Sequence, residues 1–116
     1  MKRNKNLPLT ETVFYILLAL REPMHGYLIM KQVDDLSNGD VRIAAGTLYG
    51  AIENLLKLGF IKSVPNEDKR RKVYERTTLG DDILQLEVER MKRLLRIPMK
   101  KIRENKWKYI KNFLII

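Results

Sequence analysis

One stretch of the chain constrains its fold more than any other, because a helical pattern leads directly into an alternating pattern and a run of cations. Residues 44–61 carry leucine and isoleucine at helical spacing. The residues that follow predict two strands, over 60–64 and 72–77, joined by a turn-rich segment. Four cations stand at this hairpin, Lys69-Arg70-Arg71-Lys72. A helix of this size fits the DNA major groove and a basic hairpin binds adjacent phosphates, so the stretch predicts a winged helix-turn-helix.

The remaining sequence predicts a mainly α-helical fold with this one small β-hairpin. A first helix begins after Thr10, a good N-cap, and ends before Pro23. A second helix begins at His25 and ends at Gly39, in a segment suited to a left-handed C-cap. Residues 41–43 are a candidate for one short strand.

The last predicted helix, residues 78–116, carries an apolar seam with spacings of four and three, which is typical of helices packed along one another. Pro98 cannot donate its backbone hydrogen bond, so we expect the helix to be kinked or broken there. A winged helix of this size does not need so long an extension, and symmetric dimers are the commonest oligomers. We therefore expect dimerisation through the seam; the alternative is that the helix packs back on its own domain. The candidate dimerisation residues are Leu84, Val88, Met91, Leu95 and Ile102.

Charge is concentrated in two places. The formal net charge is +9, and residues 90–111 account for it with ten Lys or Arg against one acid, Glu104. Together with the cations at 69–72, this distribution suggests a polyanionic partner, with an anionic membrane as the rival. We divide the chain into a basic N-terminal arm (1–9), a winged helix-turn-helix DNA-binding domain (10–77) and the C-terminal helix (78–116).

Composition argues against several classes of protein. An apolar content of 45% argues against disorder, and the absence of cysteine excludes disulfides and thiolate metal sites and fits a reducing cytoplasm. The single histidine, His25, has no partner at metal-ligand spacing, and there is no glycine-rich phosphate loop, so we expect no enzyme activity, metal or cofactor. The apolar run over 13–20 is too short to cross a membrane, so we expect no stable membrane insertion.

The helix predicted over residues 45–58 has two different faces. Leu48, Ile52 and Leu55 mark a buried stripe. The opposite face holds small residues, which permit close approach to a groove wall, and groups that hydrogen-bond phosphates or base edges. The candidates for DNA contact there are Thr47, Tyr49, Gly50, Asn54 and Lys57, followed by Lys69, Arg70, Arg71 and Lys72 on the hairpin. The alternative is an ordinary core helix followed by a solvated turn.

Several motifs resemble the PadR-like family of transcriptional regulators in order and spacing. They are His25-Gly26-Tyr27, Gly46-Thr47-Leu48-Tyr49, Gly59-Phe60-Ile61, Arg70-Arg71-Lys72-Val73-Tyr74 and Thr77-x-x-Gly80. The resemblance covers about residues 10–95, and the short tail is similar to that of the small-subfamily members. It implies a winged-helix homodimer that binds a pseudo-palindromic operator, usually as a repressor, through a last helix that dimerises. His25 and Tyr27 complete the DNA-binding candidates; a histidine at a helix start is more often a cap or a phosphate neighbour than a base.

Two departures from the family pattern concern specificity. The family often has Lys-Arg where this chain has Glu53-Asn54, and Asn54 can pair with adenine. Some drug-sensing members place a tryptophan on the last helix where this chain aligns Met91. If the protein senses a small molecule, the predicted pocket lies at the dimer interface, between Phe14 and Leu17 on the first helix and Met91 and Leu95 on the last.

These observations predict a cytoplasmic, homodimeric regulator that binds double-stranded DNA in a sequence-specific way and that a small-molecule effector can release. One alternative is an architectural or phage-type DNA-binding regulator without an effector. The alternative from another class is a basic helical interaction module that binds an anionic membrane surface or an acidic protein.

Overall fold

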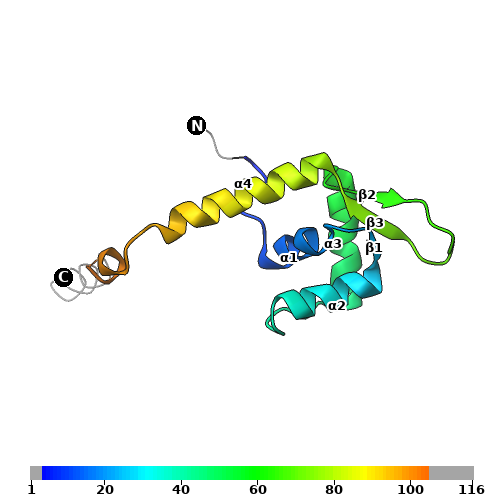
Figure 1. The fold of residues 1–116 in the computed structure, drawn as a ribbon, viewed down its shortest axis with the longest axis horizontal. Coiled ribbons are helices and arrows are strands. Elements are labelled where there is room, and N and C mark those ends of the chain that lie inside the picture. Colours follow the sequence, from blue (N-terminus) through cyan, green and yellow to red (C-terminus); the bar gives the residue numbers. More distant parts are fainter. Residues whose placement is uncertain (1–3, 105–116) are drawn as a thin grey trace.

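A computed structural model describes residues 4–104, and Figure 1 shows their arrangement. The elements follow in the order α1 (Glu11–Ala19), β1 (Met24–His25), α2 (Gly26–Leu36), α3 (Ala45–Leu58), β2 (Ile61–Val64), β3 (Val73–Arg76) and α4 (Thr78–Leu95). The first three helices pack together beside the first half of α4. The β2–β3 hairpin projects at one end, and the second half of α4 runs out beyond the other helices at the opposite end. The mainly helical winged helix-turn-helix with a long last helix is therefore confirmed.

Local signals in the sequence set the helix boundaries. Thr10 and Thr77 cap α1 and α4, because their Oγ1 atoms accept hydrogen bonds from the N–H groups of Val13 (3.2 Å) and Gly80 (3.0 Å). At the other end of α3, Gly59 has a φ of +76°, a left-handed conformation that ends the helix. The predicted starts after Thr10 and Thr77 are confirmed.

The sheet has three antiparallel strands in the order β1-β3-β2, one more than the predicted hairpin. The third strand is β1, which pairs Met24 with Tyr74 and His25 with Val73. The prediction of a strand at residues 41–43 is wrong, since this segment is irregular. Its backbone is satisfied locally instead: the Val41 N–H donates to Oγ of the buried Ser37 at 2.9 Å.

The core lies where α1, α2, α3 and α4 meet the sheet. The predicted stripe of α3, Leu48, Ile52 and Leu55, is confirmed, since each side chain is at most 2% exposed. The other fully buried side chains come from every helix and from β2, and include Ile16, Leu17, Leu20, Ile29, Val33 and Ile61. Burial of these apolar groups fixes the position of α3 and leaves its opposite face outward.

Helix α4 begins inside the domain and ends outside it. Its Leu84 is buried in the core of its own chain, Val88 and Met91 are half-buried, and Leu95 is 83% exposed. The helix ends at Leu95, and helical backbone resumes at residue 99 after Pro98. The part of the predicted last helix beyond residue 104 and the first three residues of the predicted basic arm lie outside the described residues.

The segment before α1 is held against α4. The Leu9 N–H donates to Oε2 of Glu87 at 2.5 Å, although the two residues are far apart in the sequence. Glu87 is buried and also pairs with Arg90. Leu7 and Leu9 pack against the core, so this segment closes the domain where α1 and α4 meet.

Candidate nucleic-acid interface

The outer face of α3 is open to solvent along its length. The predicted contact residues on it, Thr47, Tyr49, Gly50, Asn54 and Lys57, are all exposed. Lys57 Nζ lies 3.6 Å from Glu53 Oε1, and both side chains are more than 70% exposed. Such a surface pair contributes little to stability, so it leaves the Lys57 ammonium able to exchange partners.

Two glycines on this face have no role in the packing of the domain. Gly46 and Gly50 lie one helical turn apart, and a Cβ at either position would meet no other part of the protein within 4 Å. Glycine inside a helix costs about 1 kcal/mol relative to alanine. The fold alone therefore gives no reason for glycine at these positions, whereas the close approach of another molecule to the backbone does.

The four cations lie in the connection between β2 and β3, on the β3 side, and all are exposed. Asp68 shapes this connection: its Oδ1 accepts the Arg70 N–H at 2.9 Å, and its carboxylate lies 3.9 Å from Arg71 Nε. Asn66 adds a hydrogen bond from Nδ2 to the Arg71 carbonyl at 2.9 Å. The turn therefore has a defined shape, and it presents more positive than negative charge.

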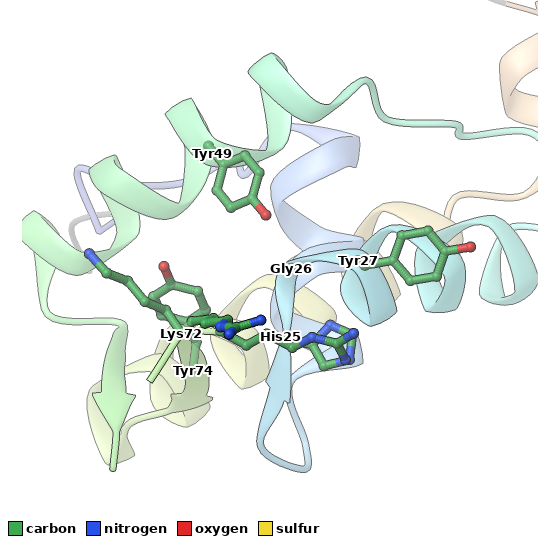
Figure 2. Close-up of a pocket in the computed structure, with 8 residues that line it drawn as sticks. His25, Gly26, Tyr27, Tyr49, Lys72 and Tyr74 are labelled. Atoms are coloured by element: carbon green, nitrogen blue, oxygen red, sulfur yellow. The ribbon is translucent and has the colours of Figure 1, made fainter. Parts of the chain in front are cut away.

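An open hollow of about 640 Å³ lies between the start of α2, the N-terminal half of α3 and the cationic connection (Figure 2). Its lining residues are His25, Gly26, Tyr27, Tyr49, Arg70, Arg71, Lys72 and Tyr74. Six of these were predicted as DNA contacts, and the fold brings them together from three segments of the chain. The other predicted contacts, Thr47, Gly50, Asn54, Lys57 and Lys69, do not line the hollow.

Sequence reasoning missed Gly26 and Tyr74 as parts of this site. A Cβ at Gly26 would lie 2.7 Å from Tyr49 Oη, so any other residue there would displace the tyrosine ring from the start of α2. Figure 2 shows the Tyr49 side chain directed from α3 toward Gly26. Burial raises the pKa of the Tyr74 hydroxyl above its usual 10.0, and the nearby Tyr49 raises it further. Both residues belong to the motifs quoted above, which was the available signal.

His25 stands where α2 meets the cationic connection. Its Nδ1 accepts a hydrogen bond from the Leu28 N–H at 3.4 Å and so caps α2. Its Nε2 lies 3.4 Å from Arg71 Nη1. The ring stacks on Tyr27 with centroids 6.5 Å apart and planes at 21°. The hollow is therefore lined by hydrogen-bond donors and aromatic rings, which suits an anionic partner.

The four residues of the predicted effector pocket are unlike one another in exposure. Leu17 is completely buried, Phe14 and Met91 are half-buried, and Leu95 is 83% exposed. The pocket was predicted at a dimer interface, so its existence stays a prediction.

Within residues 4–104, no cluster of three or more His, Asp or Glu side chains is placed to hold a metal ion. Over the same residues, no helix combines the length and the hydropathy needed to cross a membrane.

Comparison with known proteins gives a consistent answer. A family model described as the transcriptional regulator PadR-like family matches residues 15–86. A PadR family transcriptional regulator from Eggerthella lenta DSM 2243 is 32% identical, with a TM-score of 0.61, over 79% of this chain and 80% of that one. A transcriptional regulator from Clostridium thermocellum is 26% identical, also with a TM-score of 0.61, over 83% of this chain and 90% of that one.

One similar structure contains nucleic acid. Bacillus subtilis PadR in complex with operator DNA has a TM-score of 0.56 and 23% identity, over 67% of this chain and 45% of that one. At this identity the likeness is one of fold. A search of curated protein sequences finds no match.

Proposed function

The chain belongs to the PadR-like family of transcriptional regulators, and from this membership we propose that it binds operator DNA as a homodimer and represses transcription. The observation that carries the proposal is the outer face of α3, where Gly46 and Gly50 leave the backbone uncovered and Tyr49 lines a hollow together with the cations of the β2–β3 connection. The PadR-like family is a family of regulators and not of enzymes, and regulation by DNA binding requires no catalytic group.

In this proposal α3 enters the major groove with its open face toward the bases. Gly46 and Gly50 allow the helix backbone to lie close to the groove wall. Thr47 and Asn54 then reach base edges, and an asparagine amide matches the hydrogen-bonding edge of adenine. Sequence choice therefore comes from α3.

The cationic connection between β2 and β3 supplies affinity without sequence choice. Lys69, Arg70, Arg71 and Lys72 are exposed cations, and DNA phosphates present the same charge at every base step. Contacts to phosphates fix the register of the protein on the duplex, and base contacts specify the site.

The outer half of α4 supports a dimer. Leu94 and Leu95 are more than half exposed, and Met99 beyond the end of α4 is also exposed. Leucine side chains that are this exposed on one helix indicate a surface that binds another protein. We propose that Val88, Met91, Leu95 and Ile102 pack against the same residues of a second copy, whereas Leu84 belongs to the core of its own chain. A two-fold dimer implies an operator with two inverted half-sites.

Release by a small molecule would depend on the same dimer. In a single chain Leu95 is exposed and Leu17 is sealed inside the core. We place the effector site of the proposed dimer between Phe14 on α1 and the Met91 and Leu95 side chains on α4, where a second copy would cover the exposed Leu95.

Selection from random DNA tests the proposed function. The purified protein is incubated with random duplexes at moderate salt, and the bound fraction is sequenced through successive rounds. We expect enrichment of one inverted repeat, confirmed by gel shift in the presence of excess unrelated DNA. Binding to DNA without enrichment of any sequence would favour the alternative of an architectural DNA-binding protein. Binding to anionic vesicles with no binding to DNA would replace the proposal with the interaction module.

A further inference from the structure

We propose that His25 and Arg71 bind one phosphate oxygen of the DNA backbone between them, with the imidazole held as the Nε2–H tautomer by the start of α2. The inference rests on the proposed DNA binding and assigns a partner to the hollow. It is carried by the two contacts of the His25 ring, Nδ1 with the Leu28 N–H and Nε2 with Arg71 Nη1, both at 3.4 Å.

A neutral imidazole cannot make both contacts as hydrogen bonds. It carries one proton, so one nitrogen donates and the other accepts. The Leu28 N–H and the Arg71 guanidinium are both donors, and each needs an accepting nitrogen. Only one of the two can be satisfied by His25 at a time.

The cap on α2 takes precedence over the contact with Arg71. The Leu28 N–H is one of the first N–H groups of α2, which have no acceptor inside the helix, and Leu28 is half-buried. Leaving it unpaired costs the desolvation of a backbone donor. The Arg71 side chain is 64% exposed and lies near Asp68, so water and a carboxylate already serve it. Nδ1 therefore accepts, and the proton resides on Nε2.

With this tautomer, two donors stand side by side at the hollow, 3.4 Å apart. His25 and Arg71 both line the hollow, together with Lys72 and Tyr49. The ring cannot turn away easily, because it stacks on Tyr27 and is tied to α2. Two adjacent donors with added positive charge fit an oxygen that has two lone pairs and carries negative charge. A phosphodiester oxygen has these properties, and its strand would pass beside α3 when the helix lies in the major groove.

Two substitutions of His25 separate its role as the cap of α2 from its proposed role in phosphate binding. The side-chain oxygen of asparagine can replace Nδ1 as the cap but does not reach the position of Nε2. The amide nitrogen of glutamine reaches the position of Nε2 but caps poorly. We expect His25→Asn to keep the melting temperature and to lose about tenfold in affinity for the selected operator. We expect His25→Gln to melt roughly 5 °C lower and to keep most of its affinity.

Salt dependence separates the histidine from the arginine. Neutral His25 displaces no counterion, so His25→Asn should leave the slope of log affinity against log salt unchanged, whereas Arg71→Ala should reduce it by about one. The two substitutions should also be less than additive, because they remove donors from one oxygen. Since the chain has one histidine, nitrogen-15 NMR gives a direct signal for the protonated ring nitrogen, expected to be Nε2.

The outcomes distinguish this inference from the proposed function. If the wild-type protein binds no DNA, the proposed function fails and the inference fails with it. If it binds its operator but His25→Asn binds equally well, only the inference is overturned. A proton on Nδ1 in the complex, or strict additivity with Arg71→Ala, would also overturn it.

Discussion

Gly80 in the first turn of α4 lies directly against the carbonyl group of Phe60, so that a Cβ at residue 80 would collide with that oxygen. The same junction is tied by two hydrogen bonds of Thr77, from its N–H to the Phe60 carbonyl at 3.0 Å and from Oγ1 to the Gly59 carbonyl at 2.6 Å. The end of α3 and the start of α4 are thus in contact through backbone, which leaves no room for a side chain.

Gly80→Ala should therefore destabilise the protein, although alanine usually stabilises a helix. We expect the backbone clash to lower the free energy of unfolding by about 2 kcal/mol, as is typical of overpacking. Urea unfolding followed by circular dichroism measures this change. The matched control is Gly50→Ala, in open space on α3. An increase in stability for Gly80→Ala would mean that α4 can shift away from Phe60 at little cost.

Gly46→Ala and Gly50→Ala should each increase stability and weaken DNA binding. Each adds a better helix former at a position without steric conflict, worth roughly 0.5–1 kcal/mol in the free energy of unfolding. The added methyl groups would hold α3 away from the groove wall, which should lower operator affinity. Unfolding and binding titrations on the same samples measure both effects. A higher free energy of unfolding with unchanged operator affinity would contradict the close approach of α3 to the groove wall.

Changing Arg70 and Arg71 together to Ala should weaken binding to operator and random DNA alike. Each arginine displaces one counterion from a phosphate, so the slope of log affinity against log salt should shrink by about two. Titrations at several salt concentrations measure the slope. The same slope in the double variant would exclude these two residues from the phosphate contacts.

Asn54→Ala should change sequence preference without changing the salt slope. The amide is uncharged, so its loss affects a base contact and not counterion release. Repeating the selection from random DNA with this variant should show relaxed preference at one position in each half-site. If the selected sequence is the same as for the wild-type protein, Asn54 faces solvent.

Leu95→Glu should convert the proposed dimer to a monomer and abolish operator binding. The side chain is 83% exposed in one copy, so the substitution leaves the domain core intact. At the centre of the proposed seam it would bury unpaired charge, at a cost of several kcal/mol. Sedimentation measures the mass, and Leu86→Glu is the control, because Leu86 is exposed on a different side of α4. A stable dimer with Glu at position 95 would place the seam elsewhere.

The parts of the fold that depend on neighbouring residues were predictable from the sequence. The stripe of α3 follows from helical periodicity, and the caps at Thr10 and Thr77 act within three residues. The parts that depend on distant contacts were not. β1 has only two residues and exists because β3 pairs with it, whereas residues 41–43 form no strand and the Val41 N–H donates to Ser37 instead.

The candidate site shows the same division. Its cations and hydrogen-bonding residues could be recognised by type and order. That these residues line one hollow could not be recognised from the sequence, because it depends on the packing of Tyr49 against Gly26. The burial of Glu87 was equally hidden, since its partner Leu9 lies far away in the sequence.

Only Thr77 separates the end of β3 from the start of α4. Arg76 strengthens this connection, because its guanidinium donates to the Leu17 carbonyl at 2.7 Å and pairs with Asp81 on α4. In the proposed dimer the last helix would therefore be rigidly connected to the DNA-contacting face of its own copy. Any tilt of one copy against the other would then change the relative orientation of the two DNA-contacting faces. The number of base pairs between the two half-sites would then be set by the crossing angle of the two last helices.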